Sequence, residues 1–427
     1  MPADAEVLVV GGGPAGAATA FFLARAGCDV LVVDRARFPR DKPCSEYLSP
    51  QASRLLQEMG ALEALEQGDV AHLTGMRIVA PDGGEAVGTF AGSHGYRGFR
   101  DRGLAVRRTI LDARLLERAR AAGARVTEGA RVRDLERDRT GRATGALTHF
   151  SDGTARVLRA GLVIGADGLR SVVARRAGLG RLGRWPRRFA LVTHFAGADG
   201  PHEVGEMHVF GDGYIGIAPV GRDLSNVALV MPAGGDHGIG GDPAGFLARR
   251  LARAPRVARR LTSAHRVSPV RAAGPFHWHA RRARAPGVAL VGDAADFFDP
   301  FTGEGIYAAL RGGEILAPYA FEAARARDPR RADIALDAYD RCRRHEFRGK
   351  WAVERAIGMV LAAPAVMNAA TRGLAARPDL ADLLVGVTGD FVPPREVLAP
   401  GYILSLLSTA VHTSRLTPPL PRHASSL

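Results

Sequence analysis

The sequence predicts an α/β protein in which a Rossmann-type nucleotide-binding domain is interleaved with an antiparallel sheet domain and followed by a helical C-terminal region. Three observations indicate this. A glycine-rich turn follows an apolar run near the N-terminus, two further glycine–aspartate motifs follow later apolar runs, and the middle of the chain changes to longer strands of mixed polarity. At 427 residues the chain exceeds the usual size of a single core, so two domains are expected.

The first motif combines a strand, a turn and a helix. Residues 7–10 form an apolar, β-branched run typical of a buried parallel strand. The glycines that follow fit the G-x-G-x-x-G pattern, and residues 15–26 are an alanine-rich predicted helix. Such a turn lets backbone amides and a helix N-terminus approach a pyrophosphate. The predicted phosphate-binding residues are Gly11, Gly13, Pro14, Ala15 and Gly16.

The second apolar run, residues 30–33, ends at Asp34. This carboxylate lies about 20 residues beyond the glycines, where an acid binds the hydroxyls of a ribose. We therefore expect Asp34 and the adjacent Arg35 to contact the nucleoside. Because FAD and NAD share this half, the N-terminal motif alone does not distinguish them.

The third motif distinguishes the two cofactors. Residues 288–291 form another apolar run that ends at Gly292 and Asp293, whose carboxylate can accept hydrogen bonds from a ribityl chain. Gly303 and Gly305 then precede a helix predicted over residues 306–327. Its N-terminus favours the negative charge that a flavin gains on reduction. The sequence therefore predicts bound FAD.

Together these motifs resemble the flavoproteins of the p-hydroxybenzoate hydroxylase fold, and most closely their geranylgeranyl reductase-like branch, which is related to flavin-dependent monooxygenases and halogenases. The resemblance covers roughly residues 5–350. It implies that Arg108 contacts FAD, that Asp167 and Gly168 serve FAD and a passing nicotinamide, and that residues 42–50 lie near the isoalloxazine. The flavin-edge loop that it implies contains Pro300, Gly303, Glu304 and Gly305.

The domain boundaries follow from these motifs. We expect a discontinuous FAD-binding domain over residues 1–70, 100–180 and 280–350, and a substrate-binding sheet domain over residues 71–99 and 181–279. Residues 351–427 are expected to form a helical cap. Their apolar stretches, residues 357–370 and 397–412, also allow a second interpretation as membrane-surface helices in peripheral contact with a bilayer.

Candidate catalytic and substrate residues lie near the expected flavin. Cys44 is either a proton donor beside FAD or a small buried residue, and Glu46 and Tyr47 are an active-site acid and phenol or simple structural residues. In the segment 213–219 the family places large aromatic residues, whereas this chain has small ones. We predict that Tyr214 acts in catalysis and that Gly216, Ala218 and Pro219 line a pocket for a bulky substrate.

Composition excludes several other classes. The net charge of +14 comes from scattered arginines, and only Lys42 and Lys350 are lysines, so a nucleic-acid surface is not indicated. The three cysteines, Cys28, Cys44 and Cys342, fit neither a metal site nor a disulfide framework. The N-terminus lacks a signal-peptide pattern, and no apolar run reaches about 18 residues. We expect a cytoplasmic protein without a metal; the oligomeric state is left open.

The leading interpretation of function is an FAD-dependent monooxygenase. It would use NADPH or NADH as a transient reductant and O2 to oxygenate a lipophilic, aromatic or polyketide-like secondary metabolite. The alternative is a geranylgeranyl reductase-like enzyme that saturates isoprenoid double bonds. A third class is a flavin-bearing electron-transfer protein. Halogenation is not expected, because neither lysine lies in the sequence context of the halogenase lysine.

Overall fold

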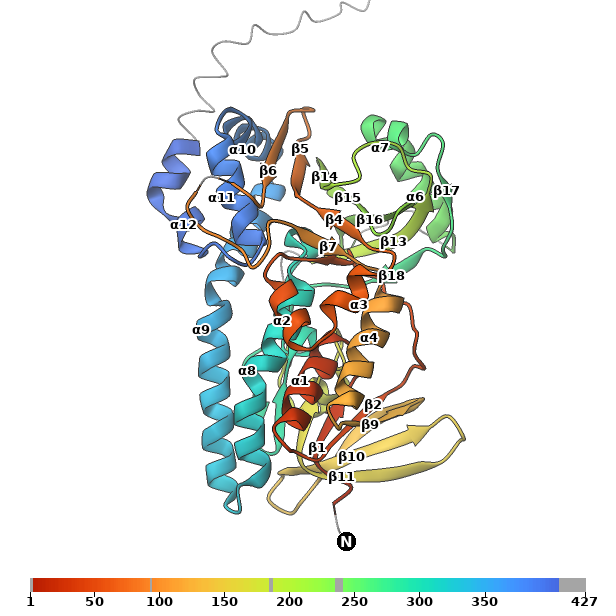
Figure 1. Ribbon diagram of the computed structural model, residues 1–427, viewed down its shortest axis with the longest axis vertical. Coiled ribbons are helices and arrows are strands. Elements are labelled where there is room, and N and C mark those ends of the chain that lie inside the picture. Colours follow the sequence, from red (N-terminus) through yellow and green to blue (C-terminus); the bar gives the residue numbers. More distant parts are fainter. Residues whose placement is uncertain (1–2, 93, 184–186, 235–240, 407–427) are drawn as a thin grey trace, which may run out of the picture.

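A parallel sheet carries the nucleotide-binding motifs. The computed structural model describes residues 3–92, 94–183, 187–234 and 241–406 (Figure 1). Five parallel strands share one sheet and end on the same edge, so the loops that follow them meet there. In spatial order they are β21 (Val288–Leu290), β11 (Ala155–Gly165), β1 (Ala5–Val10), β2 (Val30–Asp34) and β8 (Arg125–Glu128), with β20 (Arg284–Ala285) as an antiparallel edge.

Helices cover this sheet. Helix α1 (Pro14–Arg25) packs against both α4 (Arg108–Ala121) and α8 (Gly305–Arg325). Strands β9 (Ala130–Arg137) and β10 (Ala143–Phe150) form an antiparallel hairpin, and β10 pairs with β11. The sequence pattern did not predict this hairpin. The predicted α/β fold class is thus confirmed, with helix bounds within a few residues of the expected ones.

A second, mostly antiparallel sheet stands above the first (Figure 1). One of its faces is covered by α6 (Pro243–Ala252) and α7 (Pro255–Arg260), which bury apolar side chains such as Leu191 and Ile215. Its strands come from both predicted segments of the sheet domain. In spatial order they are β17 (His265–Arg266), β13 (Arg188–Ala196), β16 (Leu224–Pro232), β15 (Gly213–Pro219), β14 (Val204–Phe210), β5 (Gly75–Val79) and β6 (Glu85–Thr89), with β18 (Arg271–Ala273) paired to β13.

Two short sheets join the domains. One contains β12 (Gly180–Leu182), β19 (Trp278–Ala280) and β22 (Asp296–Phe297), so the end of the expected sheet-domain segment pairs with the FAD domain. The other contains β3 (Tyr47–Leu48), β7 (Gly103–Ala105) and β4 (Ala71–Leu73). The connecting helices are α2 (Ala52–Glu58), α3 (Leu62–Glu66) and α5 (Val172–Arg176). Short 3₁₀ turns η1 (Gly292–Ala294) and η2 (Pro300–Thr302) shape the last motif.

The C-terminal region is helical, as predicted. The long helix α9 (Pro329–Leu361) runs from the nucleotide-binding domain up to the cap, so the expected boundary at residue 351 falls inside one helix (Figure 1). The cap contains α10 (Pro364–Ala376), α11 (Pro378–Thr388) and α12 (Arg395–Leu398), whereas residues 407–427 of its predicted range lie outside the described residues. In the described part of the chain, no single helix has the length and composition to cross a membrane; α9 and α10, bent by 114°, meet those criteria only as a pair.

Candidate functional site

One large cavity lies where the motif loops meet the second sheet. Its volume is about 1480 Å³, above the roughly 300–1,000 Å³ of a site for one small ligand. It therefore has room for a dinucleotide and a second molecule. Most of the predicted site residues line it: Gly11, Gly13, Pro14, Ala15, Asp34, Arg35, Cys44, Tyr47, Arg108, Asp167, Gly168, Tyr214, Gly216, Ala218, Gly292, Asp293, Pro300, Gly303, Glu304 and Gly305.

The phosphate end fits FAD. Gly13 precedes α1 and no side chain caps that helix, so its first amides are available to a pyrophosphate. Asp34 is buried at the end of β2, and its carboxylate accepts hydrogen bonds of 2.8 Å from both Gly12 N and Ala36 N. Gly16 does not line the cavity; it allows α1 to pack closely, because a Cβ there would lie 1.8 Å from the Gly11 carbonyl oxygen.

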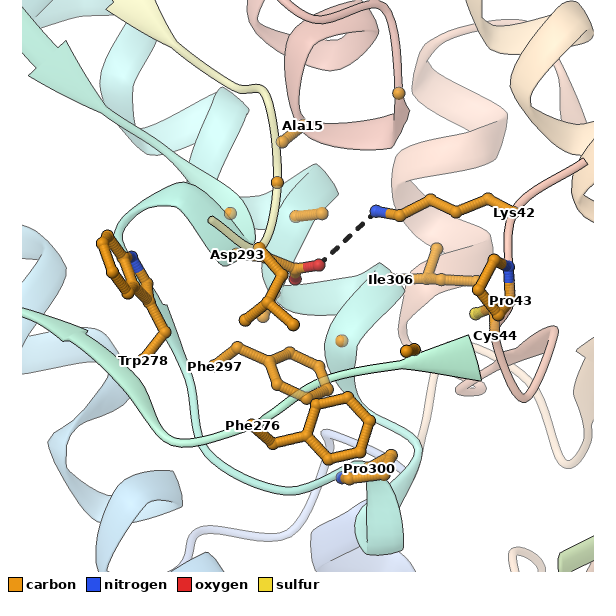
Figure 2. A pocket seen from close by; sticks show the side chains of 18 of the residues that line it. Ala15, Lys42, Pro43, Cys44, Phe276, Trp278, Asp293, Phe297, Pro300 and Ile306 are labelled. Carbon is orange, nitrogen blue, oxygen red and sulfur yellow. Dashed lines mark ion pairs between the residues drawn. The ribbon is translucent and has the colours of Figure 1, made fainter. Parts of the chain in front are cut away.

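The ribityl end fits as well. Asp293 faces the cavity, and Lys42 reaches across to it with a separation of 3.6 Å between Nζ and Oδ2 (Figure 2). Asp167 instead caps α5: its carboxylate accepts hydrogen bonds from the Ser171 hydroxyl and the Val172 amide. Burial raises the pKa of Asp167. The two motif aspartates therefore differ in how freely they can bind a cofactor hydroxyl.

Arg108 lies at the start of α4 and is buried. Its guanidinium forms two 2.7 Å hydrogen bonds with Asp112, which also pairs with Arg40 at 2.9 Å. Although burial opposes its charge, Asp112 and Cys44 together keep the pKa of Arg108 above its usual value. This arrangement places a permanent positive charge beside the Cys44 thiol.

Glu46 does not line the cavity. Its φ angle of +61° turns the side chain toward the second sheet, where it is 1% exposed. There the carboxylate accepts hydrogen bonds from His194 Nε2 at 2.7 Å and Asn226 Nδ2 at 3.1 Å, while its other oxygen binds the Arg108 amide at 2.8 Å. Glu46 thus joins α4 to the sheet rather than facing the cavity as the predicted active-site acid would.

The two predicted tyrosines differ in their surroundings. Tyr214 donates a 2.7 Å hydrogen bond to Asp299, which also binds Arg188 at 2.6 Å and caps the turn η2. Tyr214 therefore holds the flavin-edge loop. Tyr47 packs against Gly303, and its buried hydroxyl has no hydrogen-bond partner among the described residues. Burial raises the pKa of both phenols well above the usual value.

Helix α9 supplies site residues that the sequence did not identify. Lys350 lies 3.6 Å from the buried Glu304 and pairs with Asp390 of the cap. One turn further along α9, Glu354 lines the cavity without a hydrogen bond or ion pair among the described residues. The four-residue spacing from Lys350 to Glu354 predicts a shared helix face. The spacing alone does not predict which part of the protein this helix face contacts.

Burial, reinforced by the nearby Glu304, raises the pKa of Glu354 to about 8. Between about pH 4.5 and 8 the folded protein therefore keeps the proton of Glu354, whereas the unfolded chain releases it. Glu354 thus lowers the free energy of unfolding progressively as the pH rises through this range. We expect Glu354→Gln to raise the Tm relative to the parent protein by about 2 °C at pH 8, with little difference at pH 5. Calorimetry at both pH values, with the exposed Glu322→Gln as control, measures this; an equal shift at both pH values would contradict it.

Part of the remaining wall is apolar. Phe276, Phe297 and Pro300 lie on one side of the cavity, opposite Lys42 and Asp293 (Figure 2). Gly216 and Ala218 on β15 line it together with side chains of β16, which pairs with β15, and of β13, which lies beyond β16, namely Ala228, Val230, Ala190 and Val192. Pro219 ends β15, is buried and does not line the cavity. No group of three or more histidine, cysteine or acidic side chains that could hold a metal occurs within the described ranges.

Comparison with known proteins agrees with this site. Residues 4–346 match the model of a family described as FAD binding domain. Digeranylgeranylglycerophospholipid reductase 2 of Methanopyrus kandleri is 31% identical over 324 residues, which are 74% of this chain and 77% of that protein. Menaquinone reductase of Mycolicibacterium smegmatis is 33% identical over 331 residues, 74% of this chain and 76% of that protein. A match of 28% identity to conditioned medium factor receptor 1 of Dictyostelium discoideum covers 76% of this chain and 64% of that longer protein.

Solved structures share the fold. A flavin-dependent brominase superposes with a TM-score of 0.79 at 19% identity, covering 97% of this chain and 100% of the other. A geranylgeranyl bacteriochlorophyll reductase-like protein of Thermoplasma acidophilum superposes with a TM-score of 0.72 at 23% identity, covering 96% and 98%. At such identities the likeness establishes the architecture and leaves the reaction open.

Proposed function

The chain belongs to the FAD-binding-domain family of FAD-dependent oxidoreductases, and we propose that it reduces carbon–carbon double bonds in a lipophilic isoprenoid. The sequence alone favoured oxygenation. Two relatives above 30% identity over most of their length are named as reductases, one of a digeranylgeranyl lipid and one of menaquinone, and this reverses the order of the two hypotheses.

The observation that carries the proposal is the apolar compartment beside the flavin-binding loops. Its apolar lining includes the small residues of β13, β15 and β16 and the ring of Phe276, and it is part of the same cavity that Cys44 lines. An isoprenoid chain offers apolar surface and no polar groups to satisfy, which matches these walls. Polar groups that line the same cavity, Cys44 among them, can then act on the double bond.

Each part of the site has a defined task. When bound, FAD takes up reducing equivalents and supplies hydride to the substrate. The α1 amides and Asp34 hold its nucleotide end, and the N-terminus of α8 favours negative charge at the flavin edge. The apolar walls exclude water around the double bond, and the Cys44 thiol holds a proton at Sγ facing the cavity.

The proposal is tested with the FAD-loaded protein, reduced by dithionite and mixed anaerobically with geranylgeranyl diphosphate or with menaquinone carrying an unsaturated tail. We expect the flavin to be reoxidised and the isoprenoid part of the product to gain two hydrogens per double bond by mass spectrometry, counted apart from the two that reduction of a quinone ring adds. Reoxidation without a mass change in the isoprenoid part, or no reoxidation with either compound, would contradict alkene reduction.

Oxygenation is the second candidate, because Gly216 and Ala218 leave room for a bulky ring where the family has large aromatic residues. Here the same reduced protein would be mixed with O2 and aromatic compounds, and a product that gains one oxygen atom would support oxygenation.

For both reactions we propose NADPH or NADH as the transient reductant and the cytoplasm as the location. Failure of the purified protein to oxidise either nicotinamide would favour the third class, an electron-transfer protein.

A further inference from the structure

A second, much smaller opening lies behind Cys44. It is lined by residues of the Cys44 loop, of β13 and of the segment before β18, and its volume of about 10 Å³ is close to that of a single water site. Cys44 lines both this opening and the main cavity. Cys44 therefore lies between the substrate compartment and a small opening whose polar lining residues are Asp41, Lys42, His194, Ser268 and Arg271.

Resting on the proposed alkene reduction, we propose that Cys44 donates a proton to the substrate and is reprotonated from behind through this opening, with Ser268 and His194 carrying the proton and Glu46 positioning His194.

Hydrogen bonds join Glu46, His194 and Ser268, and a water in the opening would complete the path from Ser268 to Cys44. His194 Nδ1 lies 3.0 Å from the Ser268 hydroxyl, and Nε2 lies 2.7 Å from Glu46. The imidazole is 4% exposed, so the Glu46 carboxylate fixes its orientation and compensates its charge when it is protonated. Ser268 is less buried and forms part of the wall of the opening, where a water can reach both its hydroxyl and Cys44.

The same network holds the thiol in place. Asn226 donates a 2.9 Å hydrogen bond to the Cys44 carbonyl and a 3.1 Å bond to Glu46, and the Glu46 amide approaches Cys44 Sγ at 3.4 Å. Charged and titratable groups surround Cys44 from every element packed on it. These groups are Asp41, Lys42 and Glu46 of its own loop, Arg108 of α4, His194 of β13 and Arg271 of β18.

The proposed step balances. One alkene carbon receives hydride from the reduced cofactor, and the other receives the proton of the Cys44 S–H bond, which leaves a thiolate beside the Arg108 guanidinium. A water in the opening gives its proton to that thiolate. The resulting hydroxide takes a proton from protonated His194 through the Ser268 hydroxyl, and His194 later regains its proton through the same hydroxyl from solvent that refills the opening. The small opening is needed because an isoprenoid in the main cavity would keep water away from the side of Cys44 that faces that cavity.

The experiment follows the thiolate by the long-wavelength charge-transfer absorbance that it gives against oxidised flavin. FAD-loaded protein with geranylgeraniol in the main cavity is raised to a pH at which the band appears, and is then returned to neutral pH in a stopped-flow instrument. We expect the band to vanish within the mixing time in the parent protein, to be absent in Cys44→Ser, and to decay at least about tenfold more slowly in His194→Gln and Ser268→Leu.

The matched control is His208→Gln. His208 is also a buried histidine of the same sheet, bonded through Nε2 to Glu206 at 2.9 Å, but it does not line the small opening. It should leave the decay unchanged. A missing band in the parent protein, unslowed decay in both relay variants, or equal slowing in His208→Gln would overturn the proposal. FAD content and Tm identify any variant that fails to fold, and Ser268→Ala then replaces it.

Because this readout needs no turnover, it separates the two hypotheses. A working relay in a protein that does not reduce polyprenyl compounds would refute the proposed function and keep the proton path. Alkene reduction that proceeds at the parent rate in His194→Gln and Ser268→Leu would refute only the path.

Discussion

Replacing Gly16 with alanine is expected to weaken FAD binding strongly. A Cβ at this position would lie 1.8 Å from the Gly11 carbonyl oxygen and 3.0 Å from its carbon, and both are backbone atoms that no side-chain rotation can move. Helix α1 would have to separate from the Gly11 turn. That turn cannot yield easily, because Gly11 itself has a φ of +107° and contacts the Ala166 backbone. The amides that face the pyrophosphate would then lose their alignment.

We expect the Kd for FAD to rise at least about 100-fold, which corresponds to about 2.7 kcal/mol. Titration of the apoprotein with FAD, followed by flavin fluorescence, measures this. Gly12→Ala is the matched control within the same motif: the nearest atoms to its Cβ would be the side-chain ends of Leu116 and Phe38, at 3.3 Å, and these can shift. Equal affinities for the two variants would contradict the packing argument.

This nucleotide end was predictable because its determinants are local. A strand, a glycine turn, a helix and an acid follow one another within about 30 residues, and each is visible in composition and periodicity. The structure places Gly11, Gly13 and Asp34 as that pattern requires, at the carboxyl edge of parallel strands. The later motifs at Asp167 and Asp293 reach the same edge because β11 and β21 extend the same sheet.

The chemistry around Cys44 was not predictable in the same way. Whether Glu46 faces the cavity depends on its backbone turn and on His194, which lies 148 residues further along the chain. No periodicity relates the two. Likewise, the sequence context of Lys350 gave no reason to place it near a flavin, yet it lines the cavity. Lys350 lines the cavity because α9 extends beyond the nucleotide-binding domain and has one face turned toward the cavity.

Replacing Gly216 with tryptophan is expected to stop turnover while FAD remains bound. Gly216 lies in the middle of β15, paired with Met207 on one side and Ala228 on the other, and its α-carbon faces the compartment above the flavin loops. A Cβ there would have only one neighbour closer than 3.4 Å, the flexible thioether of Met207 at 3.2 Å. The indole would therefore be accepted by the strand and would fill the space that we assign to the substrate.

The test compares FAD affinity with product formation in the two assays described above. We expect the Kd for FAD to change less than about threefold, and the turnover of either substrate class to fall at least about 100-fold. Gly211→Trp is the control, since it adds the same ring at the β14–β15 turn, where a Cβ meets nothing within 4 Å. If Gly216→Trp kept full turnover, the substrate would have to bind elsewhere, and both candidate reactions would lose their shared compartment. If it lost FAD as well, the compartment could not be separate from the flavin. Retained FAD with lost turnover is the one result that follows from a cavity large enough for two molecules.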